Sequence, residues 1–111
     1  MSITEPAFFI LTALLGAPLH GYGIVGEVEQ LSEGRVQLKI GSLYGILDRL
    51  VTEGQVELDR EEPHQGRLRR YYRITGTGAA AVRAETARQA ANVRAAERRM
   101  QAYQPRRGRT A

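Results

Sequence analysis

Cysteine and tryptophan are absent from this chain of 111 residues, and phenylalanine occurs only twice. The absence of cysteine excludes disulfides, zinc fingers and catalysis by a thiol. With so few large aromatic side chains, the hydrophobic core has to be built mainly from aliphatic residues. The length suffices for one compact domain, and because so small a core is only marginally stable alone, we expect the protein to oligomerise.

Long apolar runs are lacking as well. The longest one, Ala7–Leu15, is interrupted by Thr12 and is far shorter than the roughly 20 residues that cross a bilayer. No basic region precedes this run and no small-residue cleavage site follows it, so it does not resemble a secretory signal. We therefore expect a soluble protein of the cytoplasm that does not enter a membrane.

Motifs for catalysis and for cofactor binding are also missing. The chain has no catalytic Ser-His-Asp spacing, no phosphate-binding P-loop and no carboxylate pair in an apolar setting. The Gly21–Gly23 segment lacks a preceding strand and a correctly spaced third glycine, so it is not a dinucleotide fingerprint. With two histidines and no cysteine a metal site is not expected, and His20 is interpreted as a capping or packing residue. The sequence therefore predicts a protein that is not an enzyme and needs no cofactor.

Arginine is what the chain has in excess, and its position is more informative than the net charge of +4. Residues 1–59 carry three basic and eight acidic side chains, a charge of −5, whereas residues 60–111 carry thirteen basic and four acidic ones, a charge of +9. Arginine suits bidentate contacts to phosphate and to guanine. The basic half therefore indicates either a nucleic-acid partner or an ordinary solvated basic face.

Three helices are predicted in the acidic half. The first begins within Thr4–Pro6 and is apolar on nearly all sides up to Leu15. The second covers residues 21–31 and the third residues 41–53, where Gly54 is expected to cap the C-terminus. In the second helix, apolar side chains recur at near-helical spacing at Tyr22, Val25, Val28 and Leu31. The apolar stripe of the third helix that is predicted to be buried consists of Leu43, Ile46, Leu47, Leu50 and Val51.

A β-hairpin is predicted next. Residues 55–59 and 70–74 alternate between apolar and polar side chains, as half-buried strands do. The ten residues between them contain Pro63 and Gly66 and are predicted to form a long basic loop rather than a tight turn. Arg73, on the second strand, is interpreted as the structural partner of a neighbouring acid.

A long final helix is predicted from a cap at Thr75 to about Tyr103, followed by a disordered basic tail over residues 105–111. Side chains at heptad spacing form a weakly apolar seam along this helix, beside a stripe of alanines. We therefore expect the helix to pair with its copy in a second chain and to pack on the first helix. The predicted dimer residues are Phe8, Leu11, Val82, Val93, Ala96, Met100 and Tyr103.

The order of helix, helix, helix, hairpin and helix is typical of a winged helix-turn-helix, a mainly α fold of the α+β class. In such a fold the third helix enters the major groove of DNA, and the hairpin, called the wing, contacts the backbone or the minor groove. We assign residues 1–75 to this DNA-binding domain and residues 76–104 to a dimerisation helix.

The third helix and the wing supply candidate DNA contacts. Ser42 and Tyr44 carry hydroxyl groups near the N-terminus of the third helix, where the helix dipole favours phosphate. Arg49 can reach a phosphate or the edge of a guanine. In the wing, Arg67 and Arg69 alternate toward one side and are favoured for phosphate or minor-groove contacts.

These segments together resemble the PadR family of bacterial transcriptional regulators, in its short form with a single C-terminal helix. Order and spacing agree over residues 3–80. The matching segments are Phe8–Leu14 (FFILTAL), Leu19–Ile24 (LHGYGI), Gly41–Leu50 (GSLYGILDRL), Glu53–Gly54 and Arg70–Thr75 (RYYRIT).

The resemblance implies a dimer that represses transcription from palindromic operators and is released by a small-molecule effector. It also implies that the DNA-facing positions include Tyr22 besides Ser42, Tyr44 and the basic residues of the wing. Some short members bind planar drugs between tryptophans at the dimer centre, a mode that a chain without tryptophan does not support. The predicted DNA-binding residues are thus Tyr22, Lys39, Ser42, Tyr44, Arg49, Arg67, Arg69 and Arg70.

Two other functions remain open from the sequence. The same face could bind an acidic protein, as winged helices without specific DNA binding do, and DNA would then not be retarded at low salt. A dimer cavity could instead make the protein a small-molecule carrier.

Overall fold

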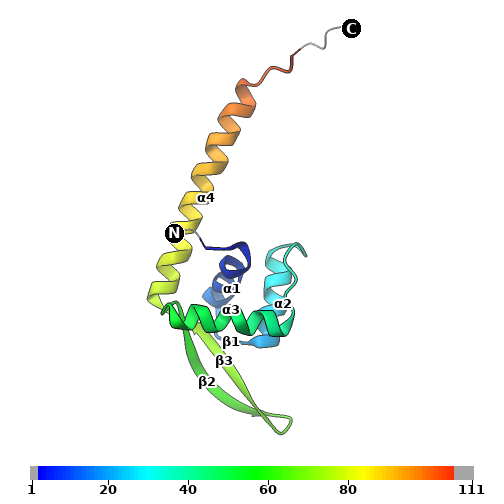
Figure 1. The fold of residues 1–111 in the computed structure, drawn as a ribbon, viewed down its shortest axis with the longest axis vertical. Helices are drawn as coiled ribbons and strands as arrows, with labels where there is room; N and C mark the ends of the chain where they lie inside the picture. Colours follow the sequence, from blue (N-terminus) through cyan, green and yellow to red (C-terminus); the bar gives the residue numbers. More distant parts are fainter. Residues whose placement is uncertain (1–2, 107–111) are drawn as a thin grey trace.

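In a computed structural model that describes residues 3–106, the chain forms four helices and three strands (Figure 1). Their arrangement confirms the predicted α+β class and the predicted order of three helices, a hairpin and a long final helix. The elements are α1 (Glu5–Gly16), β1 (Leu19–His20), α2 (Gly21–Leu31), α3 (Ile40–Thr52), β2 (Val56–His64), β3 (Arg67–Ile74) and α4 (Gly76–Ala102).

The core lies between the first three helices and the base of the hairpin. It is aliphatic, as the scarcity of large aromatic side chains predicts, and the buried apolar side chains of α1, α2 and α3 meet there. Removing this apolar surface from water is the main term that stabilises the fold. The fully buried apolar side chains are Ile10, Leu11, Ile24, Val28, Leu43, Leu47 and Val56.

Side chains cap three of the helices at their N-termini. The Thr4 hydroxyl accepts a hydrogen bond from the Ala7 amide at 3.3 Å, and the Thr75 hydroxyl accepts one from the Gly78 amide at 3.1 Å. His20 caps α2, because its Nδ1 accepts from the Gly23 amide at 3.2 Å. Each cap satisfies a backbone donor that has no partner within the helix. The predicted capping roles of Thr75 and His20 are confirmed.

The buried faces of α2 and α3 follow the apolar spacing of the sequence only in part. Tyr22 is 72% exposed and Leu31 is 41% exposed, whereas Ile24 is fully buried. A spacing of three residues drifts around a helix of 3.6 residues per turn, so Tyr22 and Leu31, at the two ends of this row, turn away from the core whereas Val28 in its middle is buried. In α3 the prediction holds for its leucines, but Val51 is 42% exposed because it points about 80° away from Leu43.

The predicted long loop of the hairpin is wrong. Strands β2 and β3 continue to His64 and Arg67, and only Gln65 and Gly66 connect them, with φ angles of 50° and 77°. Two consecutive residues in the left-handed region are typical of a type I′ hairpin turn. Pro63 is tolerated within β2 because the strand order β1-β3-β2 places β2 at the edge of the sheet.

The short strand β1 was not predicted. Leu19 pairs with Tyr72 and His20 pairs with Tyr71, both in antiparallel register, so the residues that precede α2 extend the sheet of the wing. This pairing connects the wing directly to the beginning of α2.

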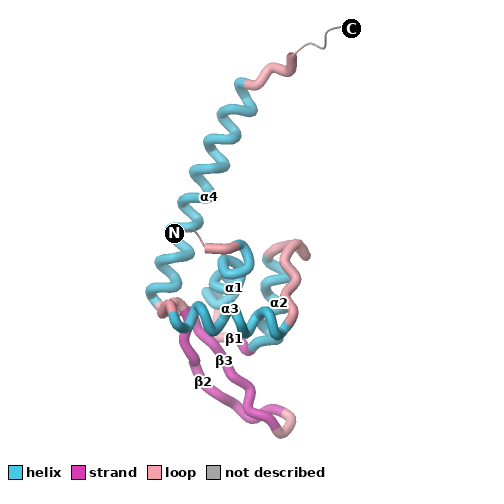
Figure 2. The backbone as a smooth tube through the Cα atoms, in the orientation of Figure 1, coloured by secondary structure: helices cyan, strands magenta, loops and turns pink. Residues whose placement is uncertain are grey.

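Helix α4 has a packed beginning and an unpacked end. Gly78, Val82 and Glu85 are buried against the domain, whereas every residue described from Ala91 onward is exposed. The helix and the wing project from opposite ends of the helical body (Figures 1 and 2). Of the predicted tail, residues 105 and 106 have no regular structure and residues 107–111 lie outside the described residues. Within residues 3–106, no helix has the length and apolarity of a membrane span.

Candidate nucleic-acid interface

A groove of about 700 Å³ lies between the wing and the N-terminal ends of α2 and α3. No residue that lines it is acidic. We call it the wing groove, and its lining residues are His20, Gly21, Tyr22, Tyr44, His64, Gln65, Arg67, Leu68, Arg69 and Arg70. Five of the eight predicted DNA-binding residues are in this set, so the fold brings together side chains that are far apart in the sequence.

The other three predicted DNA-binding residues lie outside the groove. Lys39 and Ser42 are exposed at the beginning of α3, where Lys39 occupies the cap position without a side-chain hydrogen bond. Arg49 lies farther along α3 and lines a separate cavity of about 240 Å³ beside Thr4 and Glu53. Arg49 therefore lies about one and a half turns of helix beyond Tyr44, the residue of α3 that lines the groove.

The arginines of the wing fall into two classes. Arg73 pairs with Glu57 at 2.8 Å and with Asp59 at 3.2 Å, which confirms its predicted structural role. Arg60 and Arg70 are ion-paired as well, Arg70 with a single carboxylate, that of Glu61, at 3.2 Å. The paired arginines have much of their charge neutralised within the wing.

Arg67 and Arg69 form the second class. No carboxylate among residues 3–106 lies within 4.0 Å of either guanidinium. They pair across the hairpin with His64 and Glu62 in the strand register, and both lie on one face of β3, as the alternation in the sequence predicts. These two cations are thus available to an external anion.

Tyr44 lines the groove from α3 and lies against Gly21. A Cβ atom added at Gly21 would be 2.7 Å from the Tyr44 hydroxyl oxygen, so the missing side chain makes room for the phenol. Burial raises the pKa of Tyr44 above its ordinary value, and the neighbouring Tyr72 acts in the same direction. The hydroxyl is therefore a neutral donor at physiological pH.

His20 and His64 also line the groove, and sequence reasoning missed both, together with Leu68 at the wing tip. Partial burial lowers the pKa of His20, and the positive charge of Arg69 and the nearby His64 lower it further. The signal that could have revealed His64 and Leu68 is the Gln65-Gly66 pair, since a two-residue turn places both flanking strands at the tip.

The predicted dimer residues divide into enclosed and exposed ones. Leu11 is fully buried and Val82 is 7% exposed within their own protomer, so neither has surface left for a partner. Phe8 is half-buried and contacts Phe9 edge to face. The exposed ones are Val93, Ala96, Met100 and Tyr103, all on or directly after the unpacked end of α4.

The donors that line the groove are suited to a polyanion. Within residues 3–106 no cluster of three histidine, cysteine or carboxylate side chains could hold a metal ion. Guanidinium and phenol groups are among the donors that contact phosphate oxygens in protein–nucleic acid complexes. The wing groove therefore provides the chemistry for holding a phosphodiester strand.

Residues 10–84 match the family model described as the transcriptional regulator PadR-like family. A 37.1 kDa protein in transposon TN4556 of Streptomyces fradiae is 41% identical over 69 residues, and protein X of Lysinibacillus sphaericus is 32% identical over 71 residues. These alignments cover 62% and 64% of this chain, but only 19% and 65% of the relatives' own lengths.

Solved structures share the fold at low sequence identity. A transcriptional regulator from Clostridium thermocellum superposes with a TM-score of 0.72 at 20% identity, covering 85% of this chain and 88% of that one. A PadR family regulator from Clostridium difficile gives 0.71 at 19% identity, with coverages of 87% and 99%. Bacillus subtilis PadR, solved in complex with operator DNA, gives 0.66 at 19% identity, with coverages of 95% and 52%.

Proposed function

The chain belongs to the PadR-like family of transcriptional regulators, and we propose that it acts by binding double-stranded DNA in the wing groove. Since this is a family of regulators, the expectation of a protein that is not an enzyme holds. The observation that carries the proposal is the acid-free groove in which Arg67 and Arg69 have no carboxylate partner among the described residues. The structure of Bacillus subtilis PadR with operator DNA supports it.

In the proposed complex, one phosphodiester strand runs through the wing groove. The exposed beginning of α3 then enters the major groove on one side of that strand, and the tip of the wing reaches the minor groove on the other. Arg67 and Arg69 bind phosphates from the wing, and Tyr22 and Tyr44 donate from the helical side. Phosphate contacts of this kind set the register of the protein on DNA.

In this proposal the residues at the beginning of α3 contact the bases. Lys39 and Ser42 are exposed there, within reach of base edges or of the adjacent phosphate. Arg70 joins the phosphate contacts by exchanging Glu61 for DNA. Arg49 takes no part in the groove.

We also propose a homodimer in which the unpacked ends of two α4 helices pair, so that residues 76–104 act as the dimerisation helix of the DNA-binding domain formed by residues 1–75. An exposed helix end with Val93, Met100 and Tyr103 on its surface supports this arrangement. Phe8 and Ala96 stay in the proposed interface, and the enclosed Leu11 and Val82 leave it. A two-fold axis presents the two α3 helices to half-sites of a palindrome, about one turn of DNA apart.

The regulatory outcome that we propose is repression in the cytoplasm, relieved by a small-molecule effector. It rests on the resemblance to the family and on the operator complex of Bacillus subtilis PadR. An operator covered by a dimer would be closed to transcription until an effector shifts the dimer toward a form that binds DNA less tightly.

Gel retardation followed by footprinting tests the proposal. The purified chain is mixed at low salt with duplex DNA from the region upstream of its own gene. We expect a discrete retarded species and two protected half-sites related by a two-fold axis. Absence of retardation at low salt would contradict DNA binding and would favour a winged helix that binds an acidic protein.

A further inference from the structure

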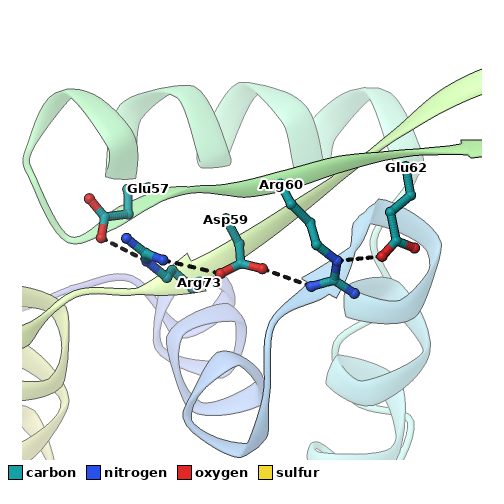
Figure 3. A network of polar contacts seen from close by, with 5 residues as sticks. All are labelled: Glu57, Asp59, Arg60, Glu62 and Arg73. Carbon is teal, nitrogen blue, oxygen red and sulfur yellow. Dashed lines mark hydrogen bonds and ion pairs between the residues drawn. The ribbon is translucent and has the colours of Figure 1, made fainter.

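One face of the wing carries a row of paired charges that the proposed DNA contacts do not use (Figure 3). Arg73 bridges Glu57 and Asp59, at 2.8 Å and 3.2 Å. Arg60 in turn pairs with Asp59 at 2.7 Å and with Glu62 at 2.6 Å. We call these five residues the charged row. It runs along the hairpin from the base toward the tip.

The charged row continues into an aromatic contact. The guanidinium carbon of Arg60 lies 3.9 Å from the centre of the Tyr71 ring, which is the geometry of a cation–π interaction. The Tyr71 ring also meets the His20 ring edge to face, with centroids 5.4 Å apart and an interplanar angle of 86°. Tyr71 thus joins the outer strand β2 to the short strand β1.

His20 carries the connection to α2. Its Nδ1 accepts a hydrogen bond from the Gly23 amide at 3.2 Å, and its backbone pairs with that of Tyr71 in the sheet. The next two residues, Gly21 and Tyr22, line the wing groove opposite the wing. The contacts therefore lead without a break from the edge of the wing to the helix that faces it.

Stability alone does not account for this row. Asp59 is 18% exposed, but its partners and the other two carboxylates, Arg60, Glu62, Arg73 and Glu57, are 43–50% exposed, and such solvent-exposed ion pairs contribute little to the free energy of folding. What the row does fix is the position of Arg60, because two carboxylates hold its guanidinium and that guanidinium also lies over the Tyr71 ring.

We infer that Arg60, Tyr71 and His20 are positioning residues that hold the wing at a fixed distance from α2. They act through Arg67 and Arg69, which they keep in place for a DNA backbone strand before DNA binds. A wing positioned in advance loses less conformational entropy on binding and so binds more tightly. The inference rests on the proposed function, DNA binding in the wing groove. It adds which residues hold that groove open before DNA binds.

Tyr71→Leu is the first test, since leucine keeps apolar volume and removes the aromatic ring. We expect DNA binding about fivefold weaker, the fold-change that corresponds to one lost cation–π contact. Arg73→Gln is the matched control, because it breaks two ion pairs of the charged row without touching Tyr71. Its affinity should stay within about twofold of the unmodified chain. Equal losses in the two variants would contradict the inference.

A double-mutant cycle separates positioning from a general loss of stability. In a chain that already carries Arg67→Ala and Arg69→Ala, Tyr71→Leu should weaken DNA binding no further, because the groups that it positions are gone. An additive loss would overturn the inference.

The variant His20→Asn separates the two roles of His20, the N-terminal cap of α2 and the ring contact with Tyr71. Asparagine is a good N-cap residue, so the melting temperature should be kept, whereas DNA binding should weaken as in Tyr71→Leu. Unchanged DNA binding in His20→Asn would show that the ring contact has no positioning role.

Hydrogen exchange in the free chain decides the matter even if no DNA binds. The backbone amides of residues 67–70 should exchange faster in Tyr71→Leu than in the unmodified chain, and at the unmodified rate in Arg73→Gln. Equal rates in all three proteins would overturn the inference. A chain that binds no DNA but shows the expected exchange would overturn only the proposed function.

Discussion

At the scale of single residues, Gly78 shows how closely α4 approaches the rest of the domain. A Cβ atom at this position would be 2.1 Å from the carbonyl oxygen of Gln55 and 2.7 Å from Cγ1 of Ile74. At Gly76, in the same first turn, a Cβ atom would meet nothing within 4 Å. The backbone of Gln55 cannot move aside as a flexible side chain can. A side chain is therefore tolerated at Gly76 but not at Gly78.

The two positions make a matched pair of substitutions. Gly78→Ala should lower the free energy of unfolding by about 2 kcal/mol or more, because the helix has to shift away from Gln55. Gly76→Ala should leave it unchanged or raise it by up to about 1 kcal/mol, since alanine favours the helix. Urea denaturation measures the free energy of unfolding of both variants. Equal effects would contradict the close contact of α4 with the backbone of Gln55.

His20 makes stability depend on pH. Its pKa is lowered mainly by burial and then by Arg69 and His64, and a protonated ring cannot accept from the Gly23 amide. The unfolded chain therefore takes up the proton first, near the ordinary histidine pKa of about 6.5. The stabilisation is complete above that pH and is lost as the pH falls through the lowered pKa.

The corresponding experiment compares urea midpoints at several pH values between neutral and mildly acidic. The unmodified chain should lose stability toward acid more steeply than His20→Asn, which keeps a cap without a titrating ring. If stability falls equally with pH in the two proteins, His20 is not the group that makes the unmodified chain less stable in acid.

At the scale of elements, the turn of the wing offers a direct prediction. Gln65 has a φ of 50° and Gly66 a φ of 77°. Asparagine tolerates the left-handed region better than glutamine, so Gln65→Asn should raise the free energy of unfolding by about 0.5 kcal/mol. Gly66→Ala should lower it by about 1 kcal/mol. Chemical denaturation of both variants checks this, and a destabilising Gln65→Asn would rule out the type I′ turn.

The elements that local sequence determines were predicted well. The second helix agrees at both ends, the third agrees to within one residue, and Gly54 follows α3 with a φ of 73°, as its predicted capping role requires. Thr75 caps α4 through its own side chain. Caps and helical periodicity depend on residues a few positions apart, so the sequence contains the information directly.

The wing and the groove depend instead on residues far apart in the sequence. Glu61 pairs with Arg70, and Leu19 pairs with Tyr72. The wing residues are polar on both sides and lack the alternation that marks a half-buried strand, so they resembled a loop. Because β1 depends on a partner strand more than forty residues away, His20 could not be placed in the groove.

At the scale of the whole molecule, α4 and the wing point in opposite directions from the helical body (Figure 1). Val93→Asp combined with Met100→Asp should give monomers or unfolded chain, because both side chains lie on the proposed dimer seam. Sedimentation velocity measures the mass. The control carries Asn92→Asp and Gln101→Asp, which add the same charges beside the seam and should leave the dimer intact. A dimeric seam variant would exclude this interface.

The charge distribution and the fold agree on where DNA should bind. The basic half of the sequence contains the wing, and among the described residues the wing groove contains two arginines without carboxylate partners. Affinity that arises from such contacts falls with salt, because each neutralised phosphate releases counterions.

The salt dependence of DNA binding is therefore the most direct test of the central claim. The measurement is the slope of log affinity against log salt for the unmodified chain, for Arg67→Ala with Arg69→Ala, and for Arg73→Ala. The double variant should bind all sequences more weakly, and its slope should be shallower by about two per bound protomer. Arg73→Ala should keep the original slope. An unchanged slope in the double variant would show that the wing groove does not hold the DNA backbone.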